Sequence, residues 1–170
     1  VQPHSKIHLL VVTDDVNMQA GTELCATLQK ANQQVMVSRL WDESSQEQIE
    51  QVRGKTNEND IIIVAVYLSI GSWKGKLGVA EPLAKFIGEI ARSSKPGILV
   101  AFGDPYVLGK MPSMDVVLAC YNGTILAERS VGHALLGLSP MKGKLPVTIP
   151  GKYARGAGLE FSTISQKKGE

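Results

Sequence analysis

The side chains of this sequence that could bind a ligand or do chemistry gather in segments that follow predicted strands. These segments are Asp14-Asp15, Trp41-Asp42-Glu43, 69–78 and 104–112. Ligands of open α/β sheets bind outside the carboxyl ends of the strands. The segment 69–78 is the best candidate, because Ser72, Trp73 and Lys74 combine a hydroxyl, a stacking ring and a cation among glycines. Contact with a sugar, a phosphate or another domain is one interpretation, and an ordinary solvated loop is the other.

The remaining polar residues give no catalytic set. Asp14-Asp15 and Asp42-Glu43 are adjacent in sequence, which points their carboxylates in different directions rather than across a scissile bond. We expect Asp14 or Asp15 to cap the following helix, and Glu81 to have a structural role at a helix start. The three histidines lack metal-ligand spacing. Neither a P-loop nor a G-x-G-x-x-G fingerprint is present. We therefore predict no catalytic residue, no metal and no cofactor in this chain.

Alternating elements must position these segments. Apolar runs predict strands at 7–13, 35–40, 60–68, 98–102 and 115–121, and a last strand at 145–149. Helical spacing predicts helices at 18–31, 45–52, 79–91 and 124–136. Ser45 with Gln48 forms a capping box, Pro82 suits a first turn, and Thr124 suits an N-cap.

The order of these elements predicts the fold. The continuous apolar run Ile61 to Val66 is typical of a strand covered on both faces. Strands alternating with helices favour a three-layer α/β/α sandwich with a mostly parallel sheet of about six strands. Pro146 cannot donate to a ladder, so the strand at 145–149 should lie at an edge.

The residues from Gly132 to Pro150 carry the most specific pattern. Gly137 suits a left-handed position after a helix, Pro140 stops the helix, and Gly143 permits a turn. The string Ala-Leu-Leu-Gly-Leu-Ser-Pro-Met-Lys-Gly-Lys-Leu-Pro-Val-Thr-Ile-Pro ends at Pro150. With Gly-Ile-Leu-Val-Ala-Phe-Gly-Asp-Pro-Tyr at 97–106 and Arg-Gly-Ala-Gly-Leu-Glu-Phe at 155–161, it resembles the C-terminal α/β domain of family 3 glycoside hydrolases.

This resemblance implies a function that no single residue shows. In that family a catalytic barrel precedes this domain and holds the nucleophile, so the chain would be an accessory part of a hydrolase for β-linked N-acetylglucosamine or glucose. Ser72, Trp73, Lys74, Asp104 and Tyr106 would contact the substrate or the barrel. For Asp104 and Tyr106 the other interpretation is a turn with a packing tyrosine. The alternatives are a free-standing flavodoxin-like module for a small phosphorylated ligand, supported by the order of elements and the lysines of 69–78, and an interaction scaffold.

Length and composition set further limits. The 170 residues suit one domain, which we place at 1–161, with a frayed tail at 162–170. A formal charge of +2 is too balanced to indicate a nucleic-acid partner, and no apolar run approaches the roughly 20 residues of a membrane span. Cys25 and Cys120 are expected to be free thiols. Because the chain starts with Val1, we expect a processed product or a piece of a longer protein, for which a periplasmic or extracellular location is slightly favoured over a cytoplasmic one.

Overall fold

The computed structural model describes residues 1–2, 4–31, 33–68 and 78–163. The strands are β1 (Lys6–Thr13), β2 (Gln34–Trp41), β3 (Ile61–Leu68), β4 (Gly97–Gly103) and β5 (Val116–Ala119). The helices are α1 (Thr22–Lys30), α2 (Gln46–Thr56), α3 (Glu81–Arg92), the short 3₁₀ helix η1 (Pro105–Gly109) and α4 (Ile125–Leu135). None of these helices is long and apolar enough to cross a bilayer.

The described strands form one parallel sheet in the order β2-β1-β3-β4-β5. This order is the flavodoxin-like one, with β1 and β3 adjacent at the centre. The central strands are buried on both faces, as the apolar run in β3 predicted. The predicted three-layer sandwich is therefore confirmed, with five strands in the described sheet instead of about six.

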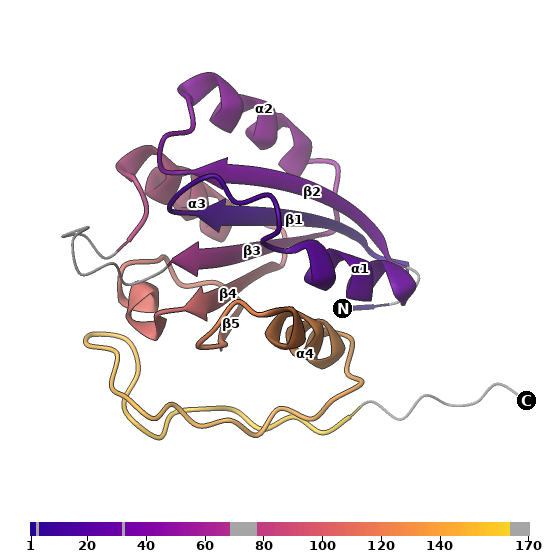
Figure 1. Cartoon of the computed structure of the whole chain (residues 1–170), viewed down its shortest axis with the longest axis vertical. Helices are drawn as coiled ribbons and strands as arrows, with labels where there is room; N and C mark the ends of the chain where they lie inside the picture. The colour runs from indigo at the N-terminus through magenta and orange to yellow at the C-terminus, as the bar shows by residue number, and fades with distance from the viewer. Residues whose placement is uncertain (3, 32, 69–77, 164–170) are drawn as a thin grey trace, which may run out of the picture.

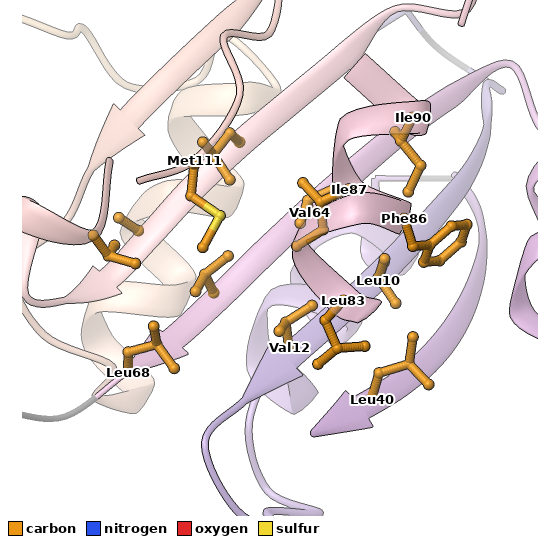
Figure 2. Packing of buried hydrophobic residues seen from close by; sticks show 14 of the residues in the cluster. Leu10, Val12, Leu40, Val64, Leu68, Leu83, Phe86, Ile87, Ile90 and Met111 are labelled. Carbon is orange, nitrogen blue, oxygen red and sulfur yellow. The ribbon is translucent and has the colours of Figure 1, made fainter. Parts of the chain in front are cut away.

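Two hydrophobic clusters lie between the sheet and the helices on its two faces. Figure 1 shows the arrangement of these layers. On one face, the sheet packs against α2 through Val52 and against α3 through Phe86 and Ile87. Figure 2 shows Phe86 and Ile87 beside Leu10 and Val64 of the sheet. On the other face it packs against α1 and α4 through Leu28 and Val131. Apolar residues of β1 and β3 alternate between the two clusters, so each of these strands packs against the helices on both faces of the sheet.

Local sequence signals place most helix ends correctly. Ser45 and Gln48 form the complete capping box of α2, and the Thr124 hydroxyl accepts a hydrogen bond from the Ala127 N–H at the start of α4. The first helix is different, because α1 begins at Thr22 and not near Met18, whose side chain is 64% exposed. Neither Asp14 nor Asp15 caps it, since the residue at the N-cap is Gly21 with a φ of 77°.

The residues after α4 form a long hairpin, which we call the arm (138–163). Its two sides are joined by backbone hydrogen bonds between Met141 and Phe161, Leu145 and Ala157, and Ile149 and Tyr153. Figure 1 shows the arm in orange and yellow, running past β5 and α4. The predicted edge strand at 145–149 is wrong, because these residues pair with the other side of the arm instead of with the sheet.

The tip of the arm completes the layer beside α3. Ile149 is buried in the cluster with Val107, Leu108 and Met111, next to η1. Lys152 Nζ donates hydrogen bonds to the Met111 carbonyl and the Ser113 hydroxyl. The tip and η1 therefore pack together against the same hydrophobic cluster as α3.

The two glycines predicted to need special backbone conformations behave differently. Gly137 has a φ of 72° after α4, as predicted, and the Leu138 N–H donates to the His133 carbonyl in the manner of a helix C-cap. Gly143 has no positive φ, and a Cβ there would meet nothing within 4 Å, so that prediction is wrong. The crowded glycine of the arm is Gly158, where a Cβ would lie 2.3 Å from the Gly143 carbonyl oxygen.

Candidate functional site

The carboxyl edge of the sheet is the edge at which the strands end, and it carries the candidate segments. The residues 14–21 follow β1, and Asp42 and Glu43 follow β2. Asp104 and η1 follow β4, and Tyr121 and Thr124 follow β5 before α4 starts. All strands are parallel, so these segments lie along the same edge. Ser72, Trp73 and Lys74 follow β3 in sequence but lie outside the described residues.

Two carboxylates of this edge are occupied by backbone groups. Asp42 Oδ1 accepts a hydrogen bond of 2.8 Å from the Ala80 N–H, at the start of α3. Asp104 is 8% exposed, and its Oδ1 accepts one of 2.9 Å from the Tyr106 N–H at the start of η1. Glu81 is exposed in the first turn of α3, and its structural role stays a prediction. The geometry therefore gives Asp42 and Asp104 structural roles.

Two tyrosines at the carboxyl edge are partly exposed to solvent. Tyr106 on η1 and Tyr121 after β5 are each 40% exposed. Tyr121 has a φ of 66°, a left-handed conformation that is costly for a residue with a bulky side chain. Partial burial, and to a lesser degree the neighbouring Tyr106, raise the pKa of Tyr121, which keeps its hydroxyl protonated near neutral pH. The edge thus presents two partly exposed phenol side chains, one of them on a strained backbone.

A buried carboxylate beneath the edge was missed by the sequence analysis. Glu128 of α4 is 3% exposed and reaches the first turn of α1. Its oxygens accept hydrogen bonds of 2.9, 2.9 and 3.0 Å from the N–H groups of Gly21, Glu23 and Leu24. Tyr67 of β3 donates a fourth bond of 3.0 Å from its hydroxyl.

These four bonds tie three elements together. A carboxylate is stabilised at the positive end of a helix dipole, so Glu128 acts as a cap for α1 supplied by another helix. Burial, and secondarily the charge of Glu128 and the hydrogen bond to it, raise the pKa of Tyr67 strongly. The sequence did contain a signal, because Glu128, Val131 and Leu135 have the spacing of one buried helix face.

The N-terminus of α1 has no free backbone donor for an anion. Glu128 takes three of its N–H groups, and the Thr22 N–H donates to the Gln19 carbonyl. Flavodoxin-like domains that bind phosphates use such donors at helix starts. The observed bonds therefore count against a phosphorylated ligand at this helix.

The histidines and cysteines do not form a second site. His8 of β1 is fully buried, and its Nε2 lies 2.8 Å from the Ser38 hydroxyl of β2. Burial, and secondarily the charge of Lys55, lower the pKa of His8 to about 4, so the ring is neutral at physiological pH. Cys25 and Cys120 are free and half-buried. Among the described residues, no three His, Cys, Asp or Glu side chains come together as metal ligands.

Exposed apolar side chains gather at the carboxyl edge. The described residues include ten large hydrophobic side chains that are exposed. Six of them follow the carboxyl ends of strands: Val16, Met18, Tyr106, Tyr121, Ile125 and Leu126. We call these six residues the edge surface. Ile125 and Leu126 are 65% and 70% exposed in the first turn of α4, three and two residues before Glu128.

The opposite, amino edge of the sheet is closed by polar contacts. The Lys6 N–H donates to Asp60 Oδ2 over 2.9 Å, and the Gly97 N–H donates to Asp115 Oδ2 over 2.8 Å. Lys95 Nζ donates to the Asn57 carbonyl over 2.6 Å. Within the described residues, the carboxyl edge therefore carries most of the exposed large hydrophobic side chains, whereas the amino edge is polar.

Comparison with solved structures identifies proteins that contain this fold. The chain matches a glycoside hydrolase family 3 β-N-acetylglucosaminidase from Paenibacillus sp. strain FPU-7 with a TM-score of 0.68 and 18% identity, over 85% of this chain and 27% of that one. It matches a fungal multi-domain β-N-acetylglucosaminidase of the same family with a TM-score of 0.71 and 17% identity, over 93% and 17%. A β-glucosidase from Listeria innocua matches with a TM-score of 0.58 and 19% identity, over 83% and 22%.

These matches confirm the predicted resemblance at the level of the fold. Neither a protein-family model nor a curated protein matches the sequence. The chain spans about a quarter or less of the solved chains named above. The fold is thus that of one domain within larger family 3 glycoside hydrolases.

Proposed function

We propose that this chain is the accessory C-terminal domain of a family 3 glycoside hydrolase, and that it docks on the catalytic barrel domain of the same polypeptide. The observation that carries this proposal is the edge surface, where six exposed apolar side chains follow the strand ends. Monomeric domains rarely leave such groups together on one side unless a partner covers them. The matched solved chains are about four to six times as long as the part that this chain covers, which fits a further domain.

The barrel would perform the hydrolysis. Family 3 enzymes named in the comparison act as a β-N-acetylglucosaminidase or a β-glucosidase, so we infer a substrate with β-linked N-acetylglucosamine or glucose. Within the described residues, Asp42 and Asp104 bind backbone N–H groups, and Glu128 is buried. Glycoside hydrolysis requires two carboxylates on opposite sides of the scissile bond. We infer that both belong to the barrel.

This proposal is tested by comparing the hydrolytic activity of the 170-residue chain with that of the complete polypeptide encoded by its gene. Aryl β-N-acetylglucosaminide and aryl β-glucoside should be hydrolysed by the complete polypeptide only. Turnover by the 170-residue chain that disappears on replacing Asp14, Asp15, Asp42 or Glu81 would contradict the proposal. A gene that encodes no barrel-sized segment of about 250 residues or more before Val1 would also contradict it.

Docking through the edge surface has its own test in the complete polypeptide. The double variant Ile125→Ser/Leu126→Ser removes two highly exposed apolar side chains. We expect it to split one thermal unfolding transition into two, because the domains no longer stabilise each other. The control is Val116→Ser, which removes an apolar side chain of 40% exposure at the start of β5, away from the edge surface. An unchanged single transition in the double variant would contradict docking at this edge.

We further propose that Ser72, Trp73, Lys74 and Tyr106 contact the substrate or the barrel, and that the buried Asp104 positions Tyr106 by accepting the hydrogen bond from its N–H. Tyr106 supports this proposal because it belongs to the edge surface. For Trp73, alanine should raise KM or weaken domain docking in the complete enzyme and leave the stability of the 170-residue chain nearly unchanged. A loss of about 3 kcal/mol in the isolated chain with unchanged affinity would assign Trp73 to the core instead.

A further inference from the structure

The half of the arm that adjoins α4 packs against little of the described part of the chain. We call residues 138–144 and 156–163 the open half of the arm, and none of their side chains is buried. Leu138, Leu159 and Phe161 are 46%, 77% and 52% exposed. By contrast, Ile149 at the tip is 1% exposed. An isolated two-stranded hairpin is at best marginally stable in water, so the open half lacks a support that the described part of the chain does not supply.

The arm also differs from the rest of the chain in charge. Residues 138–163 contain four basic and one acidic side chain, a formal charge of +3. Residues 1–137 contain twelve basic and fourteen acidic side chains, a charge of −2. Lys144 pairs with Glu160 over 3.1 Å. Among the described residues, no acidic group pairs with Lys142 or Arg155, both of which are exposed.

Exposed leucine and phenylalanine beside cations fit a partner surface that is apolar at its centre and acidic around it. Charged side chains around an apolar contact select the partner and its orientation, and are screened by salt. The lengths of the matched solved chains suggest that this partner is another domain of the same polypeptide. About three quarters or more of their residues lie outside the region that this chain covers.

We propose that the open half of the arm is a second docking element, which binds an acidic face of another domain of the same polypeptide through Leu138, Leu159, Phe161 and Lys142. This inference rests on the proposed function, since it assumes a further domain, but it concerns a different surface. The edge surface supplies apolar contact at the strand ends, and the open half adds an electrostatic contact that depends on salt.

Amide hydrogen exchange on the 170-residue chain and on the complete polypeptide tests the proposal directly. The backbone N–H groups of Met141, Gly156 and Phe161 are hydrogen-bonded within the arm. In the 170-residue chain we expect them to exchange on the order of a hundredfold faster than those of β1 and β3, because little burial protects them. In the complete polypeptide their exchange should slow at least about tenfold. Equal protection in both proteins would overturn the proposal.

Variants of the complete polypeptide separate the arm from the edge surface. Lys142→Glu/Arg155→Glu and Leu159→Ser/Phe161→Ser should remove the added protection at 138–163, and the charge variant should act most strongly at low salt. The matched control is Lys30→Glu/Lys85→Glu, which reverses two exposed cations on α1 and α3. Loss of docking in Ile125→Ser/Leu126→Ser combined with no effect of the arm variants would leave the proposed function intact and overturn this inference.

Self-association is the alternative, in which the open half of the arm binds a second copy of this chain. Sedimentation velocity of the 170-residue chain distinguishes the two, because our proposal expects a monomer at micromolar concentration. A dimer in which Leu159→Ser/Phe161→Ser restores the monomer would assign the open half to self-association and overturn the proposal.

Discussion

The sandwich (1–137) and the arm (138–163) use apolar residues in opposite ways. In the sandwich, two clusters on the two faces of the sheet bury long runs of Leu, Ile and Val from the strands and helices. In the arm, Ile149 is the one described side chain that is buried, whereas Leu159 and Phe161 are exposed. Both regions have backbone hydrogen bonds, so what separates them is burial of side chains.

This difference shows which interactions hold each region. Burial of apolar surface is the main favourable term in folding, and it is large in the sandwich and small in the arm. We expect changes in the sandwich to alter global stability, and changes in the open half of the arm to alter mainly its local opening. The tip, where Ile149 enters the core, should belong with the sandwich.

The largest effect is expected at Glu128, whose carboxylate joins α1, α4 and β3 inside the sandwich. Glu128→Ala leaves three N–H groups and the Tyr67 hydroxyl without their acceptor in a buried place. We predict a loss of about 4 kcal/mol in the free energy of unfolding, measured with urea. The control is Glu23→Ala, which breaks the partly exposed ion pair with Arg129 and should cost much less. Similar losses for the two variants would show that Glu128 does not hold the sandwich together.

The buried His8 should make the stability of the sandwich depend on pH. Its pKa is about 4 in the folded chain and 6.5 in the unfolded chain, so the unfolded chain binds the proton first as the pH falls. Stability should therefore decrease between pH 6.5 and pH 4, by about 3 kcal/mol in all, and level off below that. The difference between the wild type and His8→Gln across this range isolates the effect. A flat difference for His8→Gln would contradict the assignment.

Ile149 tests where the boundary between the two regions lies. Ile149→Ala removes the buried side chain that anchors the tip beside η1, and we predict a loss of about 2.5 kcal/mol in the free energy of unfolding. Val147→Ala, at a half-buried position two residues away, should cost less than about 1 kcal/mol. If the two variants cost the same small amount, the whole arm is peripheral and the tip does not belong to the core.

Much of the sandwich could be predicted from sequence because its signals are local and repeated. The apolar run of β3, the capping box at Ser45 and the cap at Thr124 each specify an element from its own residues. The pattern from Gly137 to Pro150 also indicated the fold that the solved structures share.

The errors came from partners distant in sequence. Residues 145–149 favour an extended conformation, but this preference is the same in a sheet edge and in a hairpin, so sequence could not show that they pair with residues 153–157. The start of α1 was misplaced for a similar reason, because its cap is Glu128, more than 100 residues later in the chain.

The sequence predicted where the candidate site lies, at the carboxyl edge of the sheet, but not most of the contacts that its residues make. The carboxyl ends of parallel strands meet at one edge, so the edge followed from the topology. The contact between Asp104 and Tyr106 is local, whereas the bonds of Asp42 and Glu128 to other elements depend on the packed structure. The roles of Ser72, Trp73 and Lys74 stay predictions, since these residues lie outside the described part of the chain.

The smallest effects are expected from two glycines of the arm, which separate local crowding from global stability. A Cβ at Gly158 would lie 2.3 Å from the Gly143 carbonyl oxygen, so Gly158→Ala must push apart the two sides of the open half. Gly143→Ala is the matched control on the facing side, because its Cβ meets nothing within 4 Å and its φ is not positive. We predict that Gly158→Ala speeds amide exchange at Met141 and Phe161 while lowering the global free energy of unfolding by no more than about 1 kcal/mol. Gly143→Ala should change neither quantity measurably. A global loss of several kcal/mol in Gly158→Ala would mean that the open half folds together with the sandwich, and the contrast between the two regions would then be wrong.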